Sequence, residues 1–195
     1  MVSSKMLRLS LMALLPISLA APTPQTVASS TEAIDWIPVD FNGKTLYVNS
    51  AAIVDSSVNP AKKAARSLLR RAGPDNDTCG PSSFDSLSGP YPTTGDCGVI
   101  RDWAYTQNTY WGVWTNTPDT HGLWYYESCV FEAGTRNVYY TYIGSTDVGD
   151  ITRDAINIWQ YGGLIAAQGN MGCDNDGSLY DGRGQSSTNW KIKHS

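Results

Sequence analysis

The sequence predicts an α+β fold, a two-layer sandwich in which an antiparallel sheet of four to five strands carries two helices on one face. Two segments have apolar residues at helical spacing, and several others are short, rich in aromatic or β-branched residues and bounded by turn residues. The four cysteines lie among these segments, so two disulfides are expected within the fold.

The first 20 residues are typical of a secretory signal peptide. Lys5 and Arg8 lead into an almost wholly apolar run of about 13 residues, and Ser18-Leu19-Ala20 offers the small residues of a cleavage site after Ala20. A membrane anchor needs roughly 20 apolar residues, and no later stretch of the sequence has them. We therefore expect a secreted, extracellular protein with no membrane span.

Residues 21–71 differ in composition from the rest of the chain. They contain no cysteine, begin with a Pro/Ser/Thr-rich stretch and end in a basic run. The basic run could be a helix on a membrane surface, but its last two residues, Arg70-Arg71, resemble the dibasic site of kexin-type processing proteases, and turn-forming chain follows them. We expect a propeptide over 21–71 and a mature domain over 72–195.

The expected mature domain is strongly acidic. Residues 72–195 hold six basic and fourteen acidic side chains, a net charge of −8, whereas the whole chain of 195 residues has −4. Nucleic acids and anionic membranes are bound by clustered Lys and Arg. Neither is an expected partner.

The first helix is expected over 95–107, because its apolar residues, Cys97 among them, form one stripe. Thr94 or Asp96 is its expected N-cap. A short aromatic strand over 110–115 follows it and ends in a cluster of turn-forming residues.

Two further strands are expected over 123–132, with Cys129 on the core face, and over 138–143. Turn-forming residues 133–137 separate them, so we expect an antiparallel hairpin.

The second helix is expected over 146–161, with Asp147 and Asp150 at its positive N-terminal end and Gly162-Gly163 after its last turn. Its expected buried stripe consists of Ile151, Ala155, Ile158 and Trp159. The remaining expected elements are strands over 164–173 and 189–193.

The cysteines Cys79, Cys97, Cys129 and Cys173 allow three pairings. Because Cys97 and Cys129 both lie on core-facing stripes, the sequence favours Cys97 with Cys129 and Cys79 with Cys173. The gaps of 18, 32 and 44 residues between them are too wide for a typical zinc site. A sequon, Asn76-Asp77-Thr78, precedes the first cysteine, and its place at the processed end favours glycosylation of Asn76.

Side chains typical of a hydrolase are sparse in the mature domain. His121 lies in a turn and His194 is the penultimate residue, and no Gly-x-Ser-x-Gly elbow accompanies them. Among the acids, Glu127 falls on the same strand face as Cys129, which would make it a half-buried carboxylate, whereas Glu132 falls on the opposite face. The simpler interpretation, which we favour, is that Glu127 faces solvent or pairs with an arginine such as Arg101. No catalytic residue and no cofactor is expected.

The segment Asp174–Asp181 is acidic and glycine-containing but lacks the spacing of an EF-hand, so it is expected to be a solvated loop rather than a calcium site. A set of aromatic residues could either stack on sugars or fill the core: Trp111, Trp114, Trp124, Tyr126, Tyr139, Tyr140 and Tyr142.

An ordered set of motifs resembles the fungal effector domain named after "extracellular protein two". These motifs are Cys79-Gly80-Pro81-Ser82-Ser83-Phe84, Asp96-Cys97, Glu127-Ser128-Cys129-Val130-Phe131, Ile143-Gly144, Asp147-Val148-Gly149-Asp150-Ile151, Gly169-Asn170-Met171-Gly172-Cys173 and Trp190. They cover nearly all of 72–195.

The resemblance implies a secreted fungal virulence factor of the necrosis-inducing type, with two intramolecular disulfides, no catalytic residues, and kinship to small α/β killer toxins. Its partner would be a host or competitor protein or a cell-wall component. The leading hypothesis is therefore a non-enzymatic effector that acts through its folded surface. A cell-wall carbohydrate-binding module using Trp124 and other exposed aromatic residues is the alternative, and a hydrolase using Glu127 is a third, weaker one.

Overall fold

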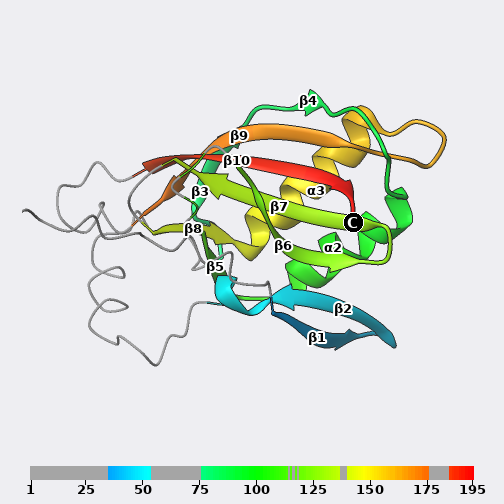
Figure 1. Ribbon diagram of the computed structural model, residues 1–195, viewed down its shortest axis with the longest axis horizontal. Helices are drawn as coiled ribbons and strands as arrows, with labels where there is room; N and C mark the ends of the chain where they lie inside the picture. Colours follow the sequence, from blue (N-terminus) through cyan, green and yellow to red (C-terminus); the bar gives the residue numbers. More distant parts are fainter. Residues whose placement is uncertain are drawn as a thin grey trace, which may run out of the picture. The chain divides into compact units, whose positions relative to one another are not determined.

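A long antiparallel sheet is the centre of the computed structural model (Figure 1). The structure describes residues 35–53, 76–113, 115, 117, 119–136, 140–175 and 185–195, and all of them lie in the compact unit formed by residues 33–195. In chain order the elements are β1 (Trp36–Phe41), β2 (Lys44–Asn49), the short 3₁₀ helix η1 (Ser50–Ala52), β3 (Cys79–Ser82), β4 (Asp85–Ser86), α2 (Thr94–Thr106), β5 (Tyr110–Val113), β6 (His121–Tyr126), β7 (Cys129–Thr135), β8 (Thr141–Gly144), α3 (Ser145–Trp159), β9 (Ala167–Asp174) and β10 (Gln185–His194).

The main sheet has the strand order β1-β2-β6-β7-β10-β9-β3, and β4 also pairs with β9. Counted over the described residues this sheet has eight strands, so the expectation of four to five strands is wrong. Strands β1 and β2 come from residues 21–71, where only a propeptide was expected, and β3 and β4 come from a stretch without strand periodicity. The α+β class, the antiparallel pairing and the two helices are as expected.

The expected strand over 123–132 is in fact two strands. The chain reverses at Glu127-Ser128, where Glu127 has a φ of +47°, and β6 then pairs with β7 as an antiparallel hairpin. The first residues of the turn expected at 133–137 belong to strand β7, which continues to Thr135. Glycine is needed at position 134 because a Cβ atom there would lie 1.9 Å from the Asp119 carbonyl oxygen. Strand β8 pairs with β5 in a separate two-stranded sheet, not with the strand before it.

Both helices lie on one face of the sheet and pack against each other (Figure 1). The N-cap of α2 is Thr93, rather than Thr94 or Asp96, and its Oγ1 accepts the N–H of Asp96 at 3.1 Å. Helix α3 begins after Gly144 and has Asp147 in its first turn, as expected. Within the described part of the chain, neither of these helices is long and apolar enough to cross a bilayer.

The hydrophobic core lies between the helices and the sheet. Its largest fully buried side chains are Trp124, Trp190, Phe131, Leu46 and Ile100. The strand stripe expected on 164–173 is buried as predicted, since Ile165, Ala167, Met171 and Cys173 have almost no exposed surface. Leu46 comes from β2, so residues that precede the expected cut at Arg71 contribute to this core.

Candidate functional site

The carboxylates that the sequence singled out lie apart in the structure. Glu127 is exposed in the turn between β6 and β7, so the interpretation of Glu127 as half-buried is wrong. Glu132 is buried in β7, where its Oε2 accepts a hydrogen bond from Thr120 Oγ1 at 2.7 Å and its Oε1 lies 3.0 Å from Lys193 Nζ. Arg101 pairs with Asp102 at 2.7 Å. Glu132 is thus paired with Thr120 and Lys193, while Glu127 stands in solvent.

The two histidines are exposed and lie on the strands that flank β7. His121 of β6 is opposite Ala133, and His194 of β10 is opposite Cys129. Four residues of strand separate these positions, roughly 13 Å. The structure does not bring the histidines together.

The acidic segment Asp174–Asp181 is described only at its first two residues. Asp174 ends β9, and Asn175 is buried with its Nδ2 donating to Ser186 Oγ at 2.7 Å. Among the described residues, no group of three or more His, Cys, Asp or Glu side chains is placed to bind a metal ion.

Trp124, the residue expected to lead a sugar-binding surface, is wholly buried. Its ring meets that of Trp111 edge-on, with 4.5 Å between the ring centroids. Trp111 and Tyr142 are buried as well, whereas Trp114 and Tyr139 lie outside the described residues. Of the tryptophans of this set that the structure describes, Trp111 and Trp124 both lie in the core and neither is exposed for stacking on a glycan.

The cysteines pair in the way that their positions suggested. Cys97 of α2 joins Cys129 of β7, and Cys79 joins Cys173, its partner in the β3–β9 ladder. The disulfides therefore fasten a helix to the middle of the sheet and strand β3 to its neighbour. No cysteine is left free.

Asp147 is the most highly connected carboxylate in the structure's described part. Its Oδ2 accepts the backbone N–H groups of Thr78 at 2.8 Å, Gly144 at 2.9 Å and Cys79 at 3.1 Å. Burial raises the pKa of Asp147 to about 7; a hydrogen bond with Asp77 also raises it, while the backbone donors lower it. We call this arrangement the Asp147 clamp. It holds the start of β3 against the start of α3 and leaves no lone pair of Oδ2 available for a substrate.

The expected glycosylation site adjoins this clamp. The carbonyl oxygen of Asn76 accepts the N–H of Thr146 at 2.9 Å, and Thr78 is buried with its hydroxyl donating to the Tyr142 carbonyl at 2.7 Å. The sequon is thus hydrogen-bonded to α3 and β8, and glycosylation of Asn76 stays a prediction. Ala20, Arg70 and Arg71 lie outside the described residues.

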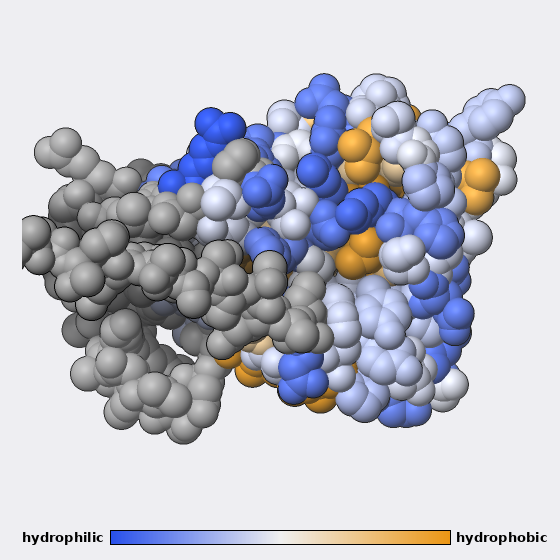
Figure 2. All heavy atoms as spheres, viewed as in Figure 1, coloured by the Kyte–Doolittle hydropathy of each residue, from blue (hydrophilic) through white to orange (hydrophobic). Residues whose placement is uncertain are grey.

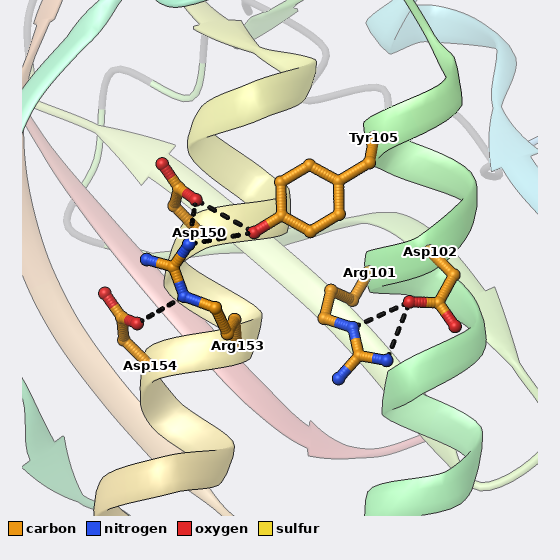
Figure 3. Close-up of polar contacts among 6 residues, drawn as sticks. All are labelled: Arg101, Asp102, Tyr105, Asp150, Arg153 and Asp154. Carbon is orange, nitrogen blue, oxygen red and sulfur yellow. Dashed lines mark hydrogen bonds and ion pairs between the residues drawn. The ribbon is translucent and has the colours of Figure 1, made fainter.

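A polar network covers the outer face of the two helices (Figure 3). Tyr105 of α2 donates its hydroxyl to Asp150 Oδ1 of α3 at 2.8 Å, and Arg153 pairs with both Asp150 and Asp154 at 2.7 Å. Burial, together with the hydrogen bond to Asp150, raises the pKa of Tyr105 to about 12. The network joins the helices to each other, and its charges pair among themselves.

Exposed apolar side chains gather where α3 ends. Of the eight large hydrophobic residues that are exposed in the described chain, four lie in residues 158–164, which we call the apolar turn: Ile158, Trp159, Tyr161 and Leu164. Tyr161 is 89% exposed and Ile158 is 55% exposed. Ile158 and Trp159 were expected to be buried, and that expectation is wrong. In Figure 2, a small orange patch lies at the right-hand end, on the side where Figure 1 draws the loop after α3.

The apolar turn has a defined backbone. Tyr161 and Leu164 exchange two backbone hydrogen bonds, of 3.0 and 3.1 Å, around Gly162 and Gly163, which have φ values of +59° and +79°. Two positive φ angles are the mark of a type I′ hairpin turn, which favours glycine.

Backbone bonds also anchor the apolar turn to the start of α2. The Thr94 N–H donates to the Gly163 carbonyl at 2.8 Å, and the Ile165 N–H donates to the Pro92 carbonyl at 3.0 Å. The exposed side chains are therefore presented on a fixed frame. The sequence analysis predicted only that Gly162-Gly163 ends a helix. The apolar residues before and after the glycine pair also indicate an exposed turn.

Comparison with protein families gives a match that includes the cysteines. Residues 78–173, about half of the chain and including all four cysteines, match the model of the Hce2 family, described as "Pathogen effector; putative necrosis-inducing factor". No curated protein matches the chain. The family match confirms the resemblance to the effector domain named after "extracellular protein two". The chain, through the domain at residues 78–173, belongs to the Hce2 family of pathogen effectors.

Proposed function

We propose that this chain is a secreted, non-enzymatic fungal effector that binds a protein of its host or of a competing microbe through the apolar turn. The observation that carries the proposal is the gathering of exposed Trp159, Tyr161 and Leu164 on a hydrogen-bonded frame. Exposed apolar patches on otherwise soluble domains mark interaction sites. Tyr and Trp are also the residues that contribute most to the binding energy of protein interfaces.

The rigidity of the turn supports this function. A loop that must be ordered on binding loses conformational entropy, whereas a preformed one does not. The bonds from Thr94 and Ile165 hold the turn beside the Cys97–Cys129 disulfide of the same helix. Reduction of that disulfide should therefore weaken binding by loosening the frame, even though no cysteine would touch the partner.

Three observations favour binding over catalysis. Glu127, the acid of the hydrolase hypothesis, lies in an exposed turn, the histidines are separated, and the buried acid Asp147 is occupied by backbone donors. The family match points the same way, because its description names an effector rather than an enzyme.

The test is infiltration of plant leaves with the purified secreted protein. We expect cell death with the oxidised protein and none after reduction and alkylation. The variant Tyr161→Ser should lose at least tenfold in potency. Its matched control, Ile37→Ser, changes a side chain that is also exposed but lies on β1, and it should keep wild-type potency. Equal potency of wild type and Tyr161→Ser would show that the apolar turn is not the binding surface.

A carbohydrate partner is an outcome that the same variants can detect. Trp159 and Tyr161 are exposed aromatic rings, the side chains that stack on sugars. We expect no retention of the protein on chitin or β-glucan beads. Retention that Tyr161→Ser abolishes would replace the proposed protein partner with a cell-wall glycan.

A further inference from the structure

We infer that residues 36–53 stay bound to the domain after the expected cut at Arg71, as a second chain that no covalent bond holds in place. This inference builds on the expected processing and concerns the product of that processing. The segment binds along the outer edge of β6. In the strand order of the main sheet, this edge is at the opposite end from β3.

The segment reaches the domain as a hairpin. Strands β1 and β2 pair over their whole length around Asn42-Gly43, whose φ values of +54° and +75° make a type I′ turn. Strand β2 then pairs with β6, which places Val48 opposite Trp124. The side-chain Nδ2 of Asn49, itself buried, donates to the Gly122 carbonyl of β6 at 2.8 Å.

Apolar and aromatic contacts reinforce this backbone pairing. Leu46, Val48 and Ala52 are buried in the same core as Trp124. On the other side of β2, the Tyr47 ring stacks on that of Tyr125 with 4.6 Å between their centroids, and the Trp36 ring meets Tyr125 edge-on at 4.9 Å.

The far end of the segment is attached as well. Ile53 forms an isolated bridge with Trp111 of β5, and the Tyr140 hydroxyl donates to the Ala51 carbonyl at 3.5 Å. Contacts therefore run from Trp36 to Ile53, so docking does not depend on one end of the hairpin.

The peptide chain itself is the only covalent connection between this segment and the domain that the sequence provides. All four cysteines lie at or after residue 79 and pair among themselves, so a cut after Arg71 leaves the hairpin held by its contacts alone. If it left, β6 would become an open strand edge beside the uncovered rings of Trp111 and Trp124. Open edges and large apolar patches favour aggregation, and the bound state avoids both.

The experiment starts from the uncut chain without its leader. A kexin-type protease cuts it at Arg70-Arg71, and size-exclusion chromatography followed by mass spectrometry identifies what elutes together. We expect the N-terminal fragment and 72–195 to co-elute in native buffer and to separate only in denaturant. Elution of 72–195 alone in native buffer, with an unfolding midpoint equal to that of the uncut chain, would overturn the inference.

Two variants make the test specific to the hairpin. Asn49→Ala removes the bond to Gly122 and should raise the rate of fragment release at least tenfold, whereas Thr45→Ala changes an exposed side chain of the same strand and should leave the rate unchanged. Equal release rates for both variants would contradict the docking role of Asn49.

A third variant separates the inference from the processing. It carries a recognition site for a sequence-specific protease in place of Arg70-Arg71. If kexin-type cleavage fails but the specifically cut protein still co-elutes, the expected processing is wrong and the non-covalent docking stands. If the specifically cut fragments separate in native buffer, the docking itself is wrong.

Discussion

The two edges of the main sheet are built in different ways. At one edge, β3 is joined to β9 by the Cys79–Cys173 disulfide and to α3 by the Asp147 clamp. At the other edge, the β1–β2 hairpin is joined to β6 only by hydrogen bonds, buried side chains and stacked rings. The family match covers the first edge and not the second. One edge of the sheet is thus crosslinked by a disulfide, whereas the other is held to the sheet by non-covalent contacts alone.

Removal of the covalent edge should have the largest effect. The double variant Cys79→Ala/Cys173→Ala opens a loop with a sequence separation of 94 residues, against 32 for Cys97–Cys129. Loop-closure entropy predicts a loss of about 4 to 5 kcal/mol in the free energy of unfolding. Chemical denaturation monitored by tryptophan fluorescence measures it, with Cys97→Ala/Cys129→Ala as the shorter-loop comparison. A smaller loss for the 79/173 pair than for the 97/129 pair would contradict this ranking.

The Asp147 clamp should make the same edge sensitive to pH. Its folded-state pKa of about 7 lies above the value of 3.8 expected in the unfolded chain, so the folded protein binds the extra proton between these pH values. The stability that this group contributes is fully present below pH ~4 and is lost as the pH rises through 7. At about 1.4 kcal/mol per unit of pKa, a shift of about 3 units corresponds to a loss of about 4 kcal/mol.

The variant Asp147→Asn tests this pH dependence. An amide keeps an oxygen that accepts the backbone N–H groups, but it does not titrate. The free energy of unfolding, measured in urea from pH 4 to 8, should fall less steeply for the variant than for the wild type. Parallel pH profiles would mean that Asp147 is not the group responsible.

The non-covalent edge should depend on packing. Leu46→Ala deletes a fully buried side chain that packs in the core with Trp124, and such deletions cost about 2 to 4 kcal/mol. Thr45→Ala, one residue away and exposed, should change stability by less than about 0.5 kcal/mol. Thermal unfolding of the uncut chain compares the two. Equal midpoints would place the hairpin outside the cooperative unit.

The turn that connects β6 to β7 should tolerate change. Glu127 has a positive φ, a conformation that glycine adopts without a steric penalty. Glu127→Gly should therefore raise the free energy of unfolding by up to about 1 kcal/mol, and cell-death activity should be unchanged. A large loss of activity in a stable Glu127→Gly protein would revive the hydrolase hypothesis.

Long periodic segments were the part of the fold that the sequence predicted well. Helices α2 and α3 and strand β9 each repeat an apolar period over many residues, and their boundaries differ from expectation by only one to three residues. Cys97 and Cys129 lie on core-facing stripes, and their partners followed from that placement. The Glu127-Ser128 reversal was missed because apolar residues continue on both sides of it and Glu127, unlike Ser128, is not a typical turn former.

The hairpin and the apolar turn were missed for other reasons. Asn42-Gly43 between alternating apolar residues is the strongest short signal for a β-hairpin. The hairpin was missed because the change of composition after residue 71 indicated a propeptide, for which no strands were expected. The exposure of Ile158 and Trp159 does not follow from periodicity, because helical spacing shows that residues share a face and not what covers it.

The hairpin and its docking site on β6 form at different stages of folding. Its own two strands are separated by two residues, so it can form early, whereas Asn49 and the carbonyl that it binds on β6 are 73 residues apart. Contacts of such long range form late in folding. Since Arg70-Arg71 lies between the hairpin and β6 in the sequence, a protease that acts too early would separate the two before they had met. If the chain is cut at Arg71, folding before the cut would let the hairpin dock on β6 while both belong to one chain.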